Sequence, residues 1–396
     1  DMSLLHLTTR LLGSLATAQH TAGALQNAIR RSIGSLSCQA EAYHCTAQRH
    51  RLVVSLRGVC LPQCREQAAG LMAEILTATR FTDTDAVAKM LRQMKTANTQ
   101  RLVSMGNRFA ASRVSARQTS AGMAKELLTG CESIRWVAQE AQGDTQEMQA
   151  LLARMEALCR RVFCRSRLTL SLSQNARGLA EGFLAALPQG EGAPEWAGFA
   201  PLPPCHEGIR IPAGVGYAAK GANLEQFGTG FTGQMYVLSN LLTFEYLWSE
   251  VRVKGGAYGT GFRVGLTGDL AATSYRDPTP GKTLDTIDGC ARALKALCAQ
   301  GTDLTKYILG AMTDADPLLD ARETMAAAEI RYLRHPTQAD VVRRRRELLG
   351  CTGAELAALC PILEQVAARG SSCIVAGEQQ LEACRDYIQE MTEIPC

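Results

Sequence analysis

The sequence predicts an α+β fold with two similar domains. Segments with helical periodicity and shorter segments with strand alternation both recur along the 396 residues. A proline- and glycine-rich segment divides the chain near its middle. On both sides of it we predict the same order of elements: a helix, a hairpin, a run of helices, a strand and a closing helix. Such a repeat is expected of two related α+β domains.

The first predicted domain covers residues 1–187. It opens with an apolar helix from Met2, and Thr21 is placed to cap a second helix. Residues 35–43 and 51–56 alternate as the two strands of a hairpin. Helices are then predicted at 62–78, from about 83 to 141 and at 145–162, and Asp83 or Thr84 should cap the second of these segments. A short strand at 168–172 and a closing helix at 176–187 complete the domain.

A linker is predicted at 188–208, where prolines and glycines favour an extended chain. The second domain follows at 209–396. Its first strand is predicted at 209–220 and its first helix at 232–252, before a hairpin. The remaining elements are helices at 283–298, 303–312, 320–333, 337–349 and 352–368, a strand at 372–376 and a closing segment at 381–388.

The two domains differ at their start. The second begins with a strand, whereas the first begins directly with a helix at Asp1. We therefore expect a strand to be missing before Asp1. Because the first residue is also not methionine, the chain is expected to be a piece of a longer polypeptide. The alternative is that the strand is disordered or never belonged to this domain.

Composition limits the classes of function. Hydrophobic residues make up 46% and charged residues 20%, which indicates a globular rather than a disordered chain. A net charge of +4 gives no support for nucleic-acid binding, and no apolar run is long enough for a membrane span. Fifteen scattered cysteines favour free thiols in a reducing compartment, so we expect a cytoplasmic location. Disulfides would need an oxidising compartment, for which nothing else argues.

Residues 244–278 are the most informative stretch. Phe244, Leu247, Trp248 and Val251 fall at helical spacing, and the glycine pair 255–256 should end that helix. Residues 258–264 then alternate as a strand, and Gly268 with Asp269 supplies a hairpin turn.

Arg252 and Tyr258 lie on the two sides of this glycine break. A turn this tight can aim a guanidinium and a phenol at one point, where they would suit a peptide carbonyl or an oxyanion developing from it. The alternative, which spacing alone favours, is a helix-end arginine bonded to carbonyls and a packed tyrosine.

The run from Leu247 to Gly259, followed by residues 274–278 (Ser-Tyr-Arg-Asp-Pro), resembles the C-terminal half of the insulinase-type (pitrilysin, M16) zinc peptidases. The closest branch is that of the presequence proteases and falcilysin, and weaker similarity extends over nearly the whole chain. The resemblance implies domains made of an antiparallel sheet covered by helices. It implies a closed chamber in which Arg252 and Tyr258 hold the backbone of an unfolded peptide. Further substrate-binding residues are then expected at Gly255, Gly256, Ala257 and Tyr275, whereas Asp277 is expected to cap the next helix.

The zinc motif of that family, His-x-x-Glu-His, does not occur in the sequence, and neither does His-Glu-x-x-His. His44 and His50 flank the first hairpin turn. They are interpreted as exposed turn histidines, and a weak metal site is the less favoured alternative. By resemblance, zinc and the general base belong to an N-terminal half or subunit, and no metal ligand is predicted in this chain.

Other motifs suggest no chemistry. The cysteine pairs, such as Cys60 and Cys64, lack zinc-knuckle spacing. Residues 255–261 are glycine-rich but precede a strand, whereas nucleotide-binding loops open a helix. Residues 343–346 are four arginines that point to all sides of a helix, as a solvated or interface helix would have, and an acidic peptide contact is the alternative.

The predicted function is therefore the substrate-binding, C-terminal half of a zinc metalloendopeptidase. Alone, the chain is expected neither to bind catalytic zinc nor to cut peptides. Its expected partners are the zinc-bearing half and the peptide substrate, with no nucleic acid or membrane. The alternative is a non-catalytic subunit of the same family, which pairs with an active subunit or serves as a scaffold.

Overall fold

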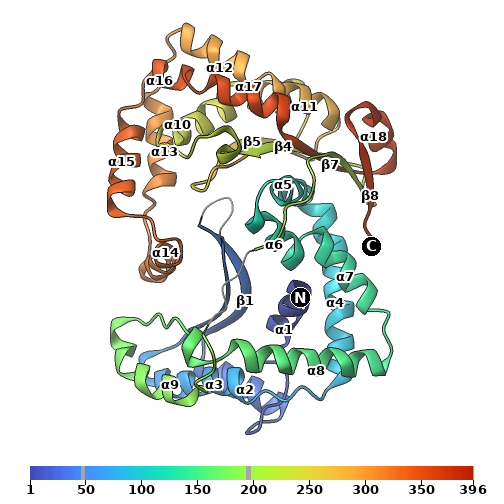
Figure 1. Cartoon of the computed structure of the whole chain (residues 1–396), viewed down its shortest axis with the longest axis vertical. Helices are drawn as coiled ribbons and strands as arrows, with labels where there is room; N and C mark the ends of the chain where they lie inside the picture. Colours follow the sequence, from blue (N-terminus) through green and yellow to red (C-terminus); the bar gives the residue numbers. More distant parts are fainter. Residues whose placement is uncertain (46–49, 193–197, 396) are drawn as a thin grey trace. The chain divides into compact units, whose positions relative to one another are not determined.

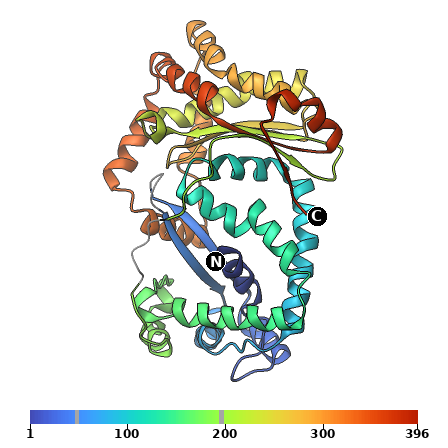
Figure 2. The ribbon, with the colours of Figure 1, turned by 45° about the vertical axis from the view of Figure 1, so that its right-hand side comes forward.

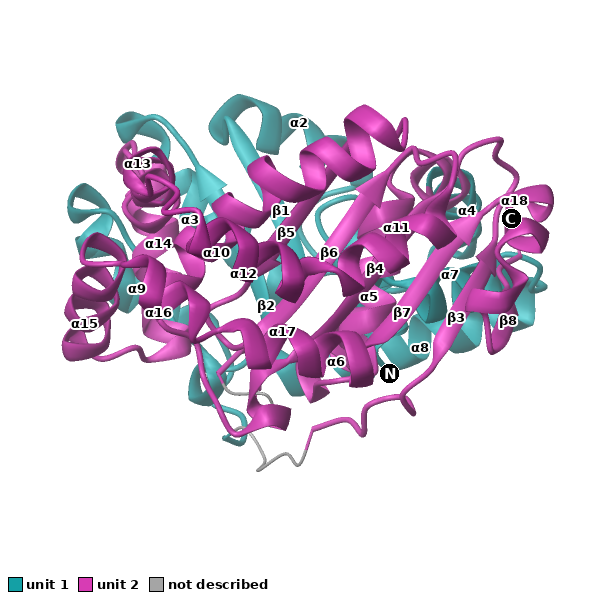
Figure 3. Ribbon diagram, turned by 90° about the horizontal axis from the view of Figure 1, so that it is seen from above, with its two compact units in different colours: residues 1–42, 52–97, 127–197 teal, residues 43–51, 98–126, 198–396 magenta. Residues whose placement is uncertain are grey.

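The computed structural model describes residues 1–45, 50–192 and 198–395. The chain forms two compact units that exchange segments along the sequence (Figure 3). Unit 1 comprises residues 1–42, 52–97 and 127–197, and unit 2 comprises residues 43–51, 98–126 and 198–396. Each unit groups the residues that pack together in space. The linear domains 1–187 and 209–396 remain a proposal drawn from the sequence repeat.

Unit 1 is mainly helical (Figure 1). Its first hairpin pairs β1 (Ser35–His44) with β2 (His50–Val59), close to the predicted strands. The hydroxyl of Thr21 accepts a hydrogen bond from the Ala24 amide, as predicted for the cap of α2, and Asp83 caps the long helix in the same way. The helices of this part of the chain are α1 (Met2–Leu11), α2 (Ala22–Ser32), α3 (Arg65–Thr77), α4 (Thr84–Ser104), α7 (Cys131–Glu140), α8 (Thr145–Val162) and α9 (Ala180–Ala186).

The predicted strand at 168–172 does not form. These residues have no regular structure and lie between the short 3-10 helices η2 (Arg165–Arg167) and η3 (Gln174–Leu179). The alternation of Leu and polar residues is present, but no neighbouring strand pairs with it in the described residues. A strand is stabilised by its partner edge, so the pattern alone was not sufficient.

Unit 2 is built on a six-stranded sheet in the order β5-β6-β4-β7-β3-β8. Its strands are β3 (His206–Arg210), β4 (Tyr217–Asn223), β5 (Gly259–Val264), β6 (Asp269–Tyr275), β7 (Ser371–Ala376) and β8 (Glu390–Glu393). Strands β5, β6, β4 and β7 pair antiparallel, whereas β3 is parallel to both β7 and β8. The α+β class is confirmed. The expected antiparallel sheet is present in β5, β6, β4 and β7, and the β3 edge adds parallel pairing that the sequence did not predict.

The single strand predicted at 209–220 is two strands. Pro212 and Gly214 interrupt it, and β3 and β4 then pair with opposite edges of β7. Proline cannot donate a ladder hydrogen bond, which explains the break. Strand β8 was not predicted, because it is short and polar.

Helices cover both faces of this sheet, as Figures 1 and 2 show. Helix α5 (Gly106–Ala116) packs on one face, and α11 (Pro280–Asp288) and α17 (Cys360–Arg369) pack on the other. The core between sheet and outer helices contains Leu241, Leu247, Phe262, Leu294 and Ile374. The remaining helices are α6 (Ser120–Thr129), α10 (Gln234–Leu241), η5 (Leu242–Lys254), α12 (Cys290–Ala299), α13 (Thr305–Ala315), α14 (Ala321–Arg334), α15 (Gln338–Leu349), α16 (Gly353–Ala357) and α18 (Glu378–Ala383). No described helix is long and apolar enough to cross a membrane.

A buried charge cluster fixes α5 to the β3 edge of the sheet. Glu207 on β3 is bound by Arg113 of α5 and by Arg117, the residue that follows α5, and the hydroxyl of Thr392 donates to it at 2.6 Å. Arg113 also reaches Glu126 of α6 at 3.3 Å. Burial alone would raise the pKa of Glu207, but the hydrogen bonds from its arginine and threonine partners outweigh burial and lower the pKa to about 2. The carboxylate is therefore ionised at neutral pH.

Candidate functional site

The candidate site lies where the helix before the glycine pair turns into β5. Residues 234–254 form one continuous helical segment, as predicted, but its second part, η5, is wound as a π-helix. The amide of Gly255 donates to the Glu250 carbonyl at 2.9 Å, and the amide of Gly256 donates to the Arg252 carbonyl at 3.1 Å. Gly256 has φ +80°, a conformation that L side chains rarely adopt. The glycine pair thus ends the helix and reverses the chain into β5.

Arg252 is half-buried in the last turn of η5. The centre of its guanidinium lies 3.9 Å from the centre of the Trp248 ring, a cation–π contact. Within the described part of the chain, no carboxylate lies at ion-pair distance from Arg252. Glu250 pairs instead with Lys254 at 2.7 Å. The N–H groups of Arg252 therefore remain available to a ligand.

Tyr258 follows the glycine turn, and its side chain is exposed. Its backbone amide donates to the Arg276 carbonyl at 3.3 Å. Its ring meets the ring of Tyr275 edge-on, with centroids 5.9 Å apart. The structure thus brings Tyr258 and Tyr275 together. It records no direct contact between the side chains of Arg252 and Tyr258 among the described residues.

The side chain of Tyr275 is held by contacts with Ser104 and Tyr217. Its hydroxyl donates to the Ser104 carbonyl at 3.2 Å, and its ring lies 5.6 Å from that of Tyr217. The Tyr217 hydroxyl donates to the Val103 carbonyl, so two tyrosines satisfy carbonyls at the end of α4. Tyr275 is in this respect a supporting residue as well as a predicted substrate-binding residue.

Asp277 has the structural role that was expected at the start of α11, but the N-cap residue of that helix is Thr279, and no described side chain caps it. The carboxylate of Asp277 accepts from the Thr279 amide at 2.9 Å and from the Thr283 hydroxyl at 2.5 Å, at the start of α11. It is fully buried. Asp277 therefore holds the chain after Tyr275 in place.

The histidine interpretation needs correction. His44 is buried, and its Nδ1 lies 3.2 Å from a carboxylate oxygen of Asp269. Burial, helped by the positive charges of Lys125 and Arg334 and by His50, outweighs Asp269 and lowers the pKa of His44 to about 4. His50 stacks against Phe199, with centroids 6.3 Å apart. His44 is thus a neutral, packed histidine rather than an exposed one.

The described side chains form no zinc-binding cluster. No group of three or more His, Cys, Asp or Glu side chains is arranged to hold a metal within residues 1–45, 50–192 and 198–395. Burial raises the pKa of Cys159 and Cys290 to about 12, so these thiols are packing residues rather than thiolate ligands.

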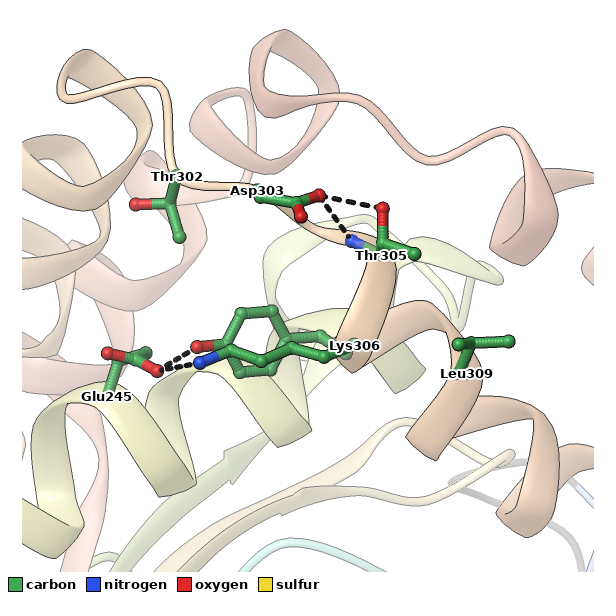
Figure 4. Close-up of a pocket in the computed structure, with 7 residues that line it drawn as sticks. Glu245, Thr302, Asp303, Thr305, Lys306 and Leu309 are labelled. Carbon is green, nitrogen blue, oxygen red and sulfur yellow. Dashed lines mark hydrogen bonds and ion pairs between the residues drawn. The ribbon is translucent and has the colours of Figure 1, made fainter.

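A surface pocket of about 450 Å³ lies between the start of η5 and the start of α13 (Figure 4). In it, Glu245 accepts hydrogen bonds from Lys306 at 2.9 Å and from the Tyr307 hydroxyl. These bonds lower the pKa of Glu245. Asp303 likewise accepts from Thr305 at 2.7 and 2.9 Å. The polar groups satisfy one another, and none of the predicted site residues lines the pocket.

Sequence reasoning missed the partnership of Trp248 with Arg252. Trp248 was assigned to the apolar face of its helix, yet it is 37% exposed and touches the guanidinium. The four-residue spacing between an aromatic residue and an arginine on one helix was the available signal.

Two family models match the chain. The model described as the PreP C-terminal domain matches residues 206–378, which include the whole candidate site. The model described as associated with the peptidases of family M16, subfamily C, matches residues 1–139.

Curated relatives agree with these matches. Protein HypA of Clostridium perfringens is 23% identical over 393 residues, covering 97% of this chain and 40% of that protein. Presequence protease 1, chloroplastic/mitochondrial, of Arabidopsis thaliana is 27% identical over 353 residues, covering 86% of this chain and 32% of that protein. The chain thus spans 32% to 40% of the length of these relatives.

Solved structures share the fold. The peptidase M16 inactive domain from Pseudomonas fluorescens has a TM-score of 0.64 at 16% identity, covering 95% of this chain and 88% of that one. Pitrilysin has a TM-score of 0.53 at 11% identity, covering 96% of this chain and 41% of that one. These structures show that the fold is shared. The two family models, which together match most of the chain, and the presequence proteases support membership of the M16 peptidase family, in its subfamily C.

Proposed function

We propose that this chain is the substrate-holding, C-terminal part of a zinc metalloendopeptidase that degrades peptides inside a closed chamber. Its relatives of known name include presequence proteases, and the family model over the candidate site is that of a C-terminal domain. The chain's residues make no zinc site among those described, so zinc and the general base would come from a separate half.

The observation that carries the proposal is the pair of available donors at one turn. The Arg252 guanidinium has no carboxylate partner in the described residues, and the Tyr258 side chain is 69% exposed. Both flank the same glycine reversal. A guanidinium and a phenol would each donate a hydrogen bond to a carbonyl oxygen of the peptide backbone. Such donors become more effective as negative charge develops on that oxygen.

The residues around these donors would complete a backbone-binding surface. Gly255 and Gly256 carry no side chain, so an extended peptide could approach them closely. Ala257, which was also expected to bind substrate, is only 3% exposed and packs into the core of the sheet, so it would support this surface from below. Tyr275 supports Tyr258 from the neighbouring strand. We propose that these residues bind the peptide mainly through its main chain, which would suit substrates of varied sequence.

Reconstitution tests the proposal. The chain should be produced alone and together with a zinc-bearing half from the same source, and each preparation assayed with an unstructured fluorogenic peptide. We expect no cleavage by this chain alone and chelator-sensitive cleavage by the pair. The size of the native polypeptide in source-cell extract, detected with an antibody against this chain, would show whether the two halves are one protein.

A second candidate function is a non-catalytic subunit. It is favoured by the similarity to a structure described as an inactive domain, of which this chain covers 88%. Such a subunit would co-purify with a zinc-bearing partner, but changes at Arg252 and Tyr258 would leave turnover unaltered. The available donors at the candidate site favour the first function.

A further inference from the structure

We infer that Trp248 is a positioning residue for Arg252: its ring holds the guanidinium while leaving the N–H groups available to the peptide. The inference rests on the proposed role of Arg252. It adds a residue that no motif in the sequence analysis assigned to the site.

The contact is close and local. The guanidinium centre lies 3.9 Å from the centre of the Trp248 ring, and the two residues are four positions apart on η5. Hydrogen bonds in a π-helix join residues five apart, so residues at this spacing lie almost one turn from each other. The backbone therefore places the ring against the arginine without help from another element.

The kind of contact matters for function. A guanidinium is planar, and its five N–H groups point outward in that plane. A carboxylate partner occupies two of these N–H groups in a bidentate pair. An aromatic ring contacts the face of the guanidinium instead and occupies none of them. Stacking on Trp248 therefore orders Arg252 without using the donors that a peptide carbonyl needs.

The surrounding charges are arranged accordingly. Glu250 is the nearest acidic residue along the helix, and it pairs with Lys254 rather than with Arg252. Phe244 lies one further step along η5, with its ring centre 6.3 Å from that of Trp248. Phe244, Trp248 and Arg252 thus form a row along the helix, in which each aromatic ring supports the next side chain.

A double-mutant cycle tests the inference in the chain assembled with its zinc-bearing half. Trp248→Ala should lower kcat/KM about fivefold, in line with one partly exposed cation–π contact. Trp248→Phe keeps a ring and should recover most of the activity. Val253→Ala is the control, since Val253 is 70% exposed on the same helix and has no proposed role. Thermal midpoints should show that all variants are folded.

The decisive reading is Trp248→Ala in an Arg252→Ala background. If Trp248 acts only through Arg252, adding Trp248→Ala to Arg252→Ala should not lower kcat/KM any further, and the effects of the two substitutions should be strongly non-additive. An equal loss of kcat/KM in both backgrounds would overturn the inference, because Trp248 would then act on the substrate or the fold directly. If Arg252→Ala itself had no effect, the proposed function would fail instead, and the two failures are thus distinct.

Discussion

Glu207 on β3 accepts two parallel hydrogen bonds from Arg113 on α5, both 2.9 Å long. The two residues are 94 positions apart in the sequence, and both side chains are buried. The pair attaches α5 to the parallel edge of the sheet. It is one of the contacts by which residues 98–126 pack with residues 198–396 rather than with their sequence neighbours.

Replacing Glu207 by Gln should strongly destabilise unit 2. The change leaves Arg113 and Arg117 buried without their shared counter-charge, for which a cost of about 3 kcal/mol is expected. The free energy of unfolding in urea measures it. Glu390→Gln is the matched control, because Glu390 is exposed and only 3.7 Å from Arg117, and it should cost under about 0.5 kcal/mol. Equal effects of the two changes would contradict the account of the cluster.

The same carboxylate should shape acid stability. Its pKa in the folded chain is about 2, below the ordinary value of 4.5. The unfolded chain therefore binds the proton more readily, so the contribution of Glu207 is complete above about pH 4.5 and declines as the pH falls towards 2. The stability difference between the native chain and Glu207→Gln, measured against pH, should shrink across this window. If the stability difference between the two chains did not change with pH, the arginines and Thr392 would not lower the pKa of Glu207, and the account would be wrong.

The packing of α5 on the sheet should not tolerate a methyl group at Gly106. A Cβ at this position would overlap the buried ring of Tyr217, and the ring cannot move away without losing its bond to Val103. Gly106→Ala should therefore cost about 2 kcal/mol of unfolding free energy. Gly70→Ala in α3 meets no atom within 4 Å and should stabilise by about 1 kcal/mol. If both substitutions lowered the free energy of unfolding, or both raised it, this description of the contact between α5 and Tyr217 would be wrong.

His44 should make the stability depend on pH between about 6.5 and 4. The unfolded imidazole binds its proton near pH 6.5 and the folded one near pH 4. As the pH falls through this window, protons favour the unfolded chain, so stability should decrease by up to about 1.4 kcal/mol per pH unit. His44→Gln should flatten this slope in thermal melts. His335→Asn, at an exposed left-handed position that Asn accepts, should leave it unchanged.

Local features were well predicted from the sequence. The caps at Thr21 and Asp83, the end of the helix before Gly255 and the buried strand before Gly377 all follow from side chains and their immediate neighbours. Such features depend on backbone preference and on nearby hydrogen bonds, which a short stretch of sequence contains.

Features that depend on distant partners were not predicted. The strand at 168–172 lacks a partner, the parallel pairing of β3 requires the last residues of the chain, and the Arg113–Glu207 pair joins helices and strands from different regions. The same holds for the candidate site. Arg252 and Tyr258 were identified from their motif, but the supporting contacts from Ser104 to Tyr275, 171 positions away, follow only from the fold.

The central claim is that Arg252 and Tyr258 hold the peptide during cleavage. The most direct test is the turnover of Arg252→Ala and Tyr258→Phe in the chain assembled with its zinc-bearing half. The controls are Arg369→Ala, which removes an arginine stacked on Phe227, and Tyr332→Phe, which removes an exposed phenol elsewhere. We predict that each site variant lowers kcat about a hundredfold, as the loss of one transition-state donor does, while both controls keep full activity. Full kcat in both site variants would contradict the claim.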